Sequence, residues 1–205
     1  MTTETAKALL ARGWKIFPVV PGFKFPACPH GFLDATDDPE QIGAWFGRGN
    51  KNIGLATGDA SGVVVIDFDS YKEECTSALQ VLMDKLGNLP QTYTVQTRAG
   101  GWHLYFKKPE GFDLRSYNNV IAKGVDLRAN GGYVLTEGCY VKDDKYGPGG
   151  SYTVRRDLPI AELPKEWAEA WQALNIPHDE ATAKKAARAA AKAAKEAAAQ
   201  ASLME

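Results

Sequence analysis

Two aspartates, Asp67 and Asp69, end an apolar run of four β-branched residues, Val63 to Ile66. Such a run is typical of a strand buried on both faces, where an isolated carboxylate is costly. Successive side chains of a strand point to opposite faces, so the two aspartates share one face. Paired carboxylates suit a hard divalent cation such as Mg²⁺, which also binds water and substrate phosphates. The alternative is that the strand simply ends and the acids begin a turn.

Other side chains able to bind ligands or carry charge lie in the second half of the chain. His103 follows a turn formed by Gly100 and Gly101, while Asp126 and Arg128 share one face of a short alternating strand. If these faces coincide with that of the first two aspartates, one cleft holds three acids, a histidine and an arginine. Taken singly, each has a structural alternative: His103 as a hydrogen-bonded core histidine, and Arg128 with Asp126 as a surface ion pair.

The elements that must position these residues follow from periodicity and turn signals. Helices are predicted over residues 5–12, 39–46, 73–86 and 179–201, and strands over residues 15–20, 52–58, 63–69, 92–97, 102–106, 125–128 and 133–135. Strands 52–58 and 63–69 are predicted to form a hairpin-like pair, and strands 92–97 and 102–106 a second hairpin. The alternation of helices and strands predicts an α/β (α+β) fold.

Length and composition indicate one domain with an appendage. A chain of 205 residues that is 44% hydrophobic is long enough to bury a core. We expect a catalytic domain over residues 1–175 and an Ala/Lys-rich helical tail or linker over residues 176–205. No apolar run approaches the roughly 20 residues of a membrane span, and the N-terminus lacks a signal-peptide pattern. The expected location is therefore the cytoplasm of a bacterium or host cell, with no membrane partner.

Cysteine content and charge exclude some classes of site. Three separated cysteines, Cys28, Cys75 and Cys139, form neither a disulfide framework nor a Cys-x-x-Cys zinc motif. The formal net charge of -1 excludes a globally basic nucleic-acid binder, so a polyanion site must be local. Between Arg98 and Arg128 six Lys and Arg residues stand against three acids, which gives modest local support for such a site.

Many short motifs agree in order and spacing with one family. The motifs are Lys24-x-Pro26, Gly31-Phe32-Leu33-Asp34-Ala35-Thr36, Asp38-Pro39 with Trp45, Asn52-Ile53-Gly54-Leu55-Ala56-Thr57-Gly58, Ser61 to Asp69, Gly100 to Phe106, and Gly124-Val125-Asp126-Leu127-Arg128 with Gly131-Gly132-Tyr133-Val134. Through them the chain resembles the bifunctional DNA primase/polymerase (prim-pol) family of the archaeo-eukaryotic primase superfamily. The resemblance covers roughly residues 5 to 170.

The resemblance implies a template-directed nucleotidyltransferase with DNA primase and DNA polymerase activity, in the replication of a phage, plasmid or other mobile element. It implies an archaeo-eukaryotic primase-type core, in which an N-terminal α/β unit packs on an RRM-like unit. The implied partners are a single-stranded DNA template with its primer, (d)NTPs, and a helicase, fused or separate.

The resemblance also implies residue roles. Asp67, Asp69 and Asp126 are the implied catalytic metal ligands for two divalent ions, Mg²⁺ or Mn²⁺, and His103, Arg128, Lys24, Gly100 and Gly101 are the implied nucleotide-binding residues. One departure is Thr97-Arg98-Ala99, where the family often has Thr-Pro-Ser and thus a hydroxyl near the phosphates. One hypothesis is that Arg98 compensates for it.

Two alternative functions and two interpretations of the tail remain open. A metal-dependent nuclease uses similar acids, and it would shorten a strand without nucleotides rather than lengthen it with them. A non-catalytic module binding single-stranded nucleic acid needs exposed aromatic side chains on the sheet, for which Tyr105 is a weak candidate. The tail is predicted to be an exposed helix that acts as a solvated spacer, or else as a basic helix touching nucleic acid.

Overall fold

The computed structural model describes residues 3–68, 73–145 and 147–202. The chain divides into two compact units, Met1–Gln172 and Ala173–Glu205. The first unit contains every strand of the described residues, and the second consists mainly of helix α5 (Asn175–Ser202). The assignment of catalysis to residues 1–175 stays a prediction.

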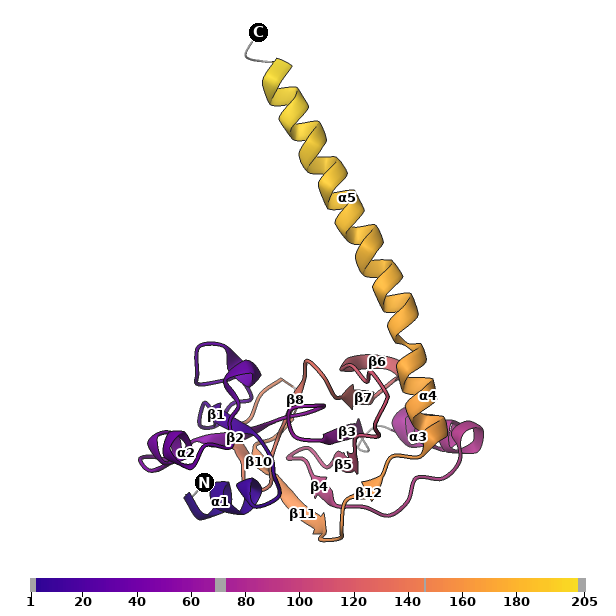
Figure 1. The fold of residues 1–205 in the computed structure, drawn as a ribbon. Coiled ribbons are helices and arrows are strands. Elements are labelled where there is room, and N and C mark those ends of the chain that lie inside the picture. The colour runs from indigo at the N-terminus through magenta and orange to yellow at the C-terminus, as the bar shows by residue number, and fades with distance from the viewer. Residues whose placement is uncertain (1–2, 69–72, 146, 203–205) are drawn as a thin grey trace. The chain divides into compact units, whose positions relative to one another are not determined.

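The larger sheet of the first unit is built around strand β3 (Val63–Phe68) (Figure 1). β3 lies between β5 (Trp102–Lys107) and β7 (Val125–Arg128) and is antiparallel to both. Among the described residues this sheet has seven strands, the others being β4 (Thr94–Gln96), β6 (Tyr117–Ala122), β11 (Thr153–Arg156) and β12 (Ala161–Glu162). β12 pairs with β5 in parallel, whereas the other pairs of this sheet are antiparallel.

The smaller sheet pairs β2 (Asn52–Ala56) with β1 (Ile16–Val19) on one side and β8 (Tyr133–Leu135) on the other. A short ribbon joins β9 (Tyr140–Val141) to β10 (Gly150–Ser151). The N-terminal part also contains α1 (Thr3–Leu10), the 3-10 helix η1 (Gly31–Asp34) and α2 (Pro39–Phe46). The Asp38 side chain caps α2 by accepting from the backbone N–H of Glu40 at 3.1 Å, and Pro39 takes the first helical position.

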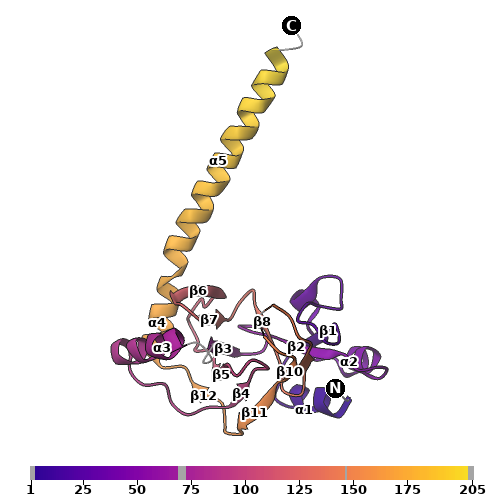
Figure 2. The same cartoon turned by 180° about the vertical axis from the view of Figure 1, so that it is seen from behind.

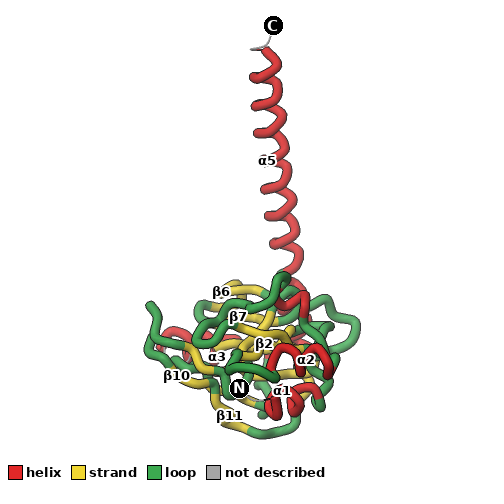
Figure 3. Tube along the Cα trace, turned by 90° about the vertical axis from the view of Figure 1, so that its left-hand side faces the viewer, coloured by secondary structure: helices red, strands yellow, loops and turns green. Residues whose placement is uncertain are grey.

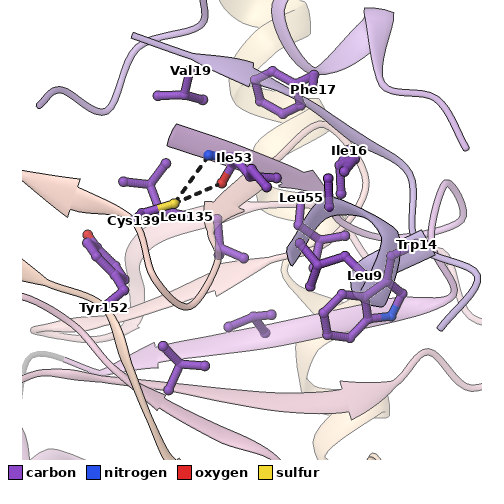
Figure 4. Packing of buried hydrophobic residues seen from close by; sticks show 14 of the residues in the cluster. Leu9, Trp14, Ile16, Phe17, Val19, Ile53, Leu55, Leu135, Cys139 and Tyr152 are labelled. Atoms are coloured by element: carbon purple, nitrogen blue, oxygen red, sulfur yellow. Dashed lines mark hydrogen bonds between the residues drawn. The ribbon is translucent and has the colours of Figure 1, made fainter. Parts of the chain in front are cut away.

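The main apolar core draws on both sheets. Val65 and Tyr105 of the larger sheet belong to the same buried cluster as Ile16 and Ile53 of the smaller one. Figure 4 shows the packing around Ile53, whose backbone N–H donates to Cys139 Sγ at 3.2 Å while the thiol donates back to its carbonyl at 3.4 Å. The buried thiol thus satisfies backbone polar groups inside the core. This shared core fixes the position of one sheet relative to the other.

Two helices, α3 (Glu73–Leu86) and α4 (Lys165–Ala173, of which all but the last residue belong to the first unit), lie beside the larger sheet (Figure 2). Val64, Ile66 and Phe68 alternate with the residues of the main core and are buried on the opposite face of β3. Two buried tryptophans of α4 anchor this helix to the rest of the first unit through hydrogen bonds. Trp167 Nε1 donates to the carbonyl of Gly87 at 2.9 Å, and Trp171 Nε1 to that of Arg115 at 2.6 Å.

The hairpin-like pair predicted for strands 52–58 and 63–69 is wrong. β2 and β3 belong to different sheets, and one isolated bridge between Gly58 and Val63 joins the segments. Apart from Asp67 of β3, both strands are buried, and each lies between two partners within its own sheet. The hairpin of β4 and β5 is confirmed. The mixed content and mainly antiparallel pairing agree with an α+β fold, whereas the primase-type core and the RRM-like unit stay predictions.

The described part of the chain contains no helix long and apolar enough to cross a membrane. Helix α5 of the second unit is continuous (Figure 3). Its side chains are exposed over residues 176–186, which agrees with the prediction of an exposed helical tail.

Removing residues 176–205 is expected to leave the thermal unfolding midpoint of the remaining protein within about 2 °C of the full chain, because exposed side chains contribute little to stability. Differential scanning calorimetry of both proteins measures this. A matched control ends the chain after Pro164 and so removes buried Trp167 and Trp171; this shorter protein should unfold at a much lower temperature. A large destabilisation by the first truncation would show that the tail is part of the folded domain.

Candidate active site

Asp67 lies at the centre of the candidate site because of the register of the larger sheet. It is directly opposite His103 of β5 on one side and Asp126 of β7 on the other. Residues paired in this way have Cβ atoms about 4.5–5.5 Å apart and point to the same face. Three of the predicted site residues, from distant parts of the sequence, are therefore neighbours on one face of the sheet.

His103 is buried and faces a more accessible carboxylate. Its Nε2 is 3.6 Å from Asp67 Oδ1, and the side chains of His103 and Asp67 are 5% and 24% exposed. The imidazole packs with its centroid 6.2 Å from the ring of Tyr105 and 5.6 Å from that of Tyr152. Aromatic packing thus fixes the ring while one edge stays beside the carboxylate.

Asp126 is held by its neighbours. Arg128 Nη2 donates to Asp126 Oδ2 at 2.6 Å, and the backbone N–H of Asn119 donates to Asp126 Oδ1 at 2.9 Å. About a quarter of each side chain of this ion pair is exposed. The structure therefore contains the ion pair that was the structural alternative for Arg128. Binding of a phosphate by Arg128 requires this pair to open or to share its charge.

A pocket of about 270 Å³ adjoins these residues. Four predicted site residues line it: Lys24, Asp67, His103 and Arg128. Lys24 comes from the loop after β1, far from the others in sequence, and its carbonyl accepts a hydrogen bond from Tyr133 Oη at 2.9 Å. The pocket thus combines a carboxylate and an imidazole with two cationic side chains, and these cations suit a phosphorylated ligand.

Gly100 and Gly101 form the predicted turn but do not line this pocket. The backbone N–H of Thr97 donates to the carbonyl of Gly101 at 2.8 Å, and that of Gly100 to the carbonyl of Thr97 at 3.0 Å. Gly100 has a φ of +89°, which a residue with a side chain rarely adopts. The turn aligns β4 with β5 and so positions His103, while nucleotide binding by the two glycines stays a prediction.

Arg98 of the same turn has a structural role. Its guanidinium is almost fully buried, donates to the carbonyls of Gly147 and Pro148 at 2.8 and 2.6 Å, and pairs with Asp144. These contacts hold the segment before β10 against the β4–β5 turn. In this structure Arg98 is therefore engaged with the protein and does not supply the missing phosphate contact.

Sequence reasoning missed several residues that line the pocket. Gly131 and Gly132 were named only as part of a motif, and their place in it beside Tyr133 was the signal that could have found them. Tyr152 lies in a segment for which no element was predicted. Burial, and then the negative charge of Asp67, raises the pKa of Tyr152, so its phenol is neutral at neutral pH. The Tyr152 side chain, which lines the pocket, is therefore uncharged.

The predicted metal ligands are only partly described. Asp67 and Asp126 project from one face, whereas Asp69 lies outside the described residues. In residues 3–68, 73–145 and 147–202 no group of three or more His, Cys, Asp or Glu residues is arranged to hold a metal ion. The donor set fits Mg²⁺ nonetheless, because this ion is commonly bound by one or two carboxylates with water and substrate phosphates. Two-metal binding stays a prediction.

Comparison with known proteins identifies the family of the chain. No curated protein matches the chain at a significant level. The model of the N-terminal domain of bifunctional DNA primase/polymerase matches residues 6–166, a range that contains every predicted site residue and ends within α4. The match covers most of the chain and confirms the resemblance drawn from the motifs. The chain therefore belongs to the bifunctional DNA primase/polymerase family.

Proposed function

We propose that this protein is a template-directed nucleotidyltransferase that primes and extends DNA from (d)NTPs on a single-stranded template. Family membership implies a primase/polymerase-type enzyme. The observation that carries the proposal is the placement of His103 and Asp126 directly opposite Asp67, beside a pocket with two cationic side chains. The resemblance supports a role in replicating a phage, plasmid or other mobile element in the cytoplasm, with a fused or separate helicase supplying unwound template.

In the proposed reaction the primer 3′-hydroxyl oxygen attacks the α-phosphorus of the nucleotide, and the bond to pyrophosphate breaks. Asp67, Asp126 and, by its place in the motif, Asp69 would hold divalent Mg²⁺ or Mn²⁺, which when bound neutralises the triphosphate and the charge that develops on it. Lys24 and Arg128 add positive charge around the phosphates. His103 would donate a hydrogen bond to a phosphate oxygen of the nucleotide from Nε2, the imidazole nitrogen that lies beside Asp67.

Arg128 has two acceptors in this proposal. Without nucleotide it neutralises Asp126, as the 2.6 Å hydrogen bond indicates. With nucleotide it turns toward a phosphate oxygen and leaves the carboxylate of Asp126 available. Exchange of one anionic partner for another costs less than desolvating an unpaired guanidinium, because the charge stays compensated throughout.

The primary test is primer extension, together with de novo priming from labelled nucleotides. Product lengthening that requires nucleotides supports the proposal, whereas strand shortening without nucleotides would identify a nuclease instead. The non-catalytic alternative based on Tyr105 is not supported, because this side chain is fully buried and cannot stack on a base.

His103→Ala is expected to weaken nucleotide binding about 10- to 100-fold, because a charge-assisted contact to phosphate is worth roughly 1.5–3 kcal/mol. Binding of Mn²⁺ without nucleotide should stay near wild type, since the carboxylates remain. Calorimetric titration of each ligand into both proteins measures the two effects. His103→Gln, which keeps a donor, serves as a control and should recover part of the nucleotide affinity. Unchanged nucleotide affinity with lost Mn²⁺ affinity would make His103 a metal ligand.

A further inference from the structure

The loop between β1 and η1 exposes two aromatic side chains. Phe23 is 41% exposed and Phe25 54%, and their ring centroids are 4.9 Å apart with planes inclined by 30°. Phenylalanine is usually buried, so a neighbouring pair at the surface indicates contact with a partner. We name the surface formed by Phe23, Phe25, Lys24 and Lys142 the aromatic-basic patch.

The backbone beneath this patch is fixed before any partner binds. Buried Asn52 donates from Nδ2 to the carbonyl of Phe23 at 3.1 Å and to that of Tyr140 at 2.7 Å. Its Oδ1 accepts from the backbone N–H of Tyr140 at 3.0 Å. The backbone N–H of Lys142 donates to the carbonyl of Gly22 at 2.9 Å, which joins the loop to the end of β9. A partner therefore meets a preformed surface and loses little free energy in ordering it.

Charge and shape indicate the chemistry of this partner. Lys142 Nζ is 5.5 Å from the centroid of Phe23, and a hollow of about 260 Å³ is lined by the four patch residues. Two acids also line the hollow: Asp144 is neutralised by its ion pair with Arg98, whereas Asp143, whose Oδ1 accepts from the backbone N–H of Gly149 at 2.7 Å, keeps its charge. The two lysines therefore outnumber the one uncompensated carboxylate. Exposed aromatic faces beside cations suit unpaired bases joined by phosphates, whereas a duplex keeps its base faces stacked.

The aromatic-basic patch is continuous with the candidate active site. Lys24 lines both the hollow at the patch and the pocket that contains Asp67 and His103. Tyr133, which also lines that pocket, holds the backbone of Lys24 in place. A strand bound at the patch is thus directed toward the catalytic residues.

We propose that Phe23 and Phe25 stack on bases of the unpaired template strand, with Lys142 contacting its phosphates, while Lys24 lies between this surface and the nucleotide pocket. This inference rests on the proposed function, since it identifies the surface that carries the template into that site. It names residues that none of the motifs assigns to template binding.

The test is fluorescence anisotropy with a labelled 20-nucleotide oligo-dT, measured without nucleotide or divalent metal. Phe25→Ala and Phe23→Ala should each weaken binding on the order of tenfold, and the double variant more, because each removes a stacking contact. Phe25→Trp should keep wild-type affinity. Lys142→Gln should reduce the slope of the logarithm of the binding constant against the logarithm of salt concentration by about one, because one phosphate contact is lost. Val81→Ala on α3 is the matched control, because Val81 is 50% exposed and outside the patch.

Wild-type affinity in the double variant would overturn the inference, as would equal affinity of the wild-type protein for duplex DNA of the same length. The patch would be assigned to a protein partner instead if the wild type binds a proline-rich peptide, and if Phe25→Ala abolishes that binding but leaves the affinity for oligo-dT unchanged. Primer extension by the wild type is measured separately. If the wild type extends no primer but the patch variants still lose oligo-dT binding, the proposed function is rejected. The assignment of the aromatic-basic patch to binding of single-stranded DNA is then retained.

Discussion

Asp67→Asn is expected to reduce primer extension by about 10³-fold or more while the protein stays folded. The substitution keeps the shape of the side chain but removes the negative charge that a divalent cation requires, and stabilisation by bound metal is worth several kcal/mol. Asp67 faces Asp126 across neighbouring strands, and the substitution removes one of two like charges while the ion pair of Asp126 with Arg128 remains. The thermal unfolding midpoint should therefore equal or exceed that of the wild type.

Extension of a labelled primer on a single-stranded template, with dNTPs and either Mg²⁺ or Mn²⁺, measures this effect. The control is Asp84→Asn, which neutralises an exposed carboxylate of α3 whose Oδ1 accepts from Gln80 at 2.8 Å. This control should extend primers like the wild type. Normal extension by Asp67→Asn would reject the assignment of Asp67 as a catalytic metal ligand.

Trp171→Ala is expected to lower the free energy of unfolding by about 3–5 kcal/mol. The side chain is fully buried, and its indole N–H donates to the carbonyl of Arg115 at 2.6 Å. Truncation removes a large apolar group from the core and leaves that carbonyl without its indole donor. Urea denaturation followed by circular dichroism gives the change in free energy.

Two variants make the loss at Trp171 interpretable. Trp171→Phe keeps most of the apolar surface but no indole N–H, so it should cost less than the alanine variant. Val154→Ala, on partly exposed β11, should change the free energy of unfolding by about 0.5 kcal/mol or less. A loss below about 1 kcal/mol in Trp171→Ala would show that α4 contributes little to the folded domain.

The sequence determined the features that depend on neighbouring residues. The β-branched run of β3, the cap of α2 at Asp38 and the β4–β5 hairpin with its Gly100 turn all follow from local patterns. The pattern of aspartates and the motifs around them also identified the family, because the order and spacing of short motifs can be compared without knowing their tertiary contacts. Alternation within single strands correctly placed Asp126 and Arg128 on one face.

Only the tertiary structure decided which strands meet. A fully buried apolar strand has two edges that can pair with many partners, so its sequence does not reveal that β3 pairs with β5 and β7 rather than β2. Register depends on the faces that the core buries, and a slip of one residue would turn Asp67 away from His103 and Asp126. The ion pair of Asp126 with Arg128 and the buried bonds of Arg98 depend on neighbouring groups and side-chain directions. Local periodicity does not predict these interactions, because they form when distant segments pack together.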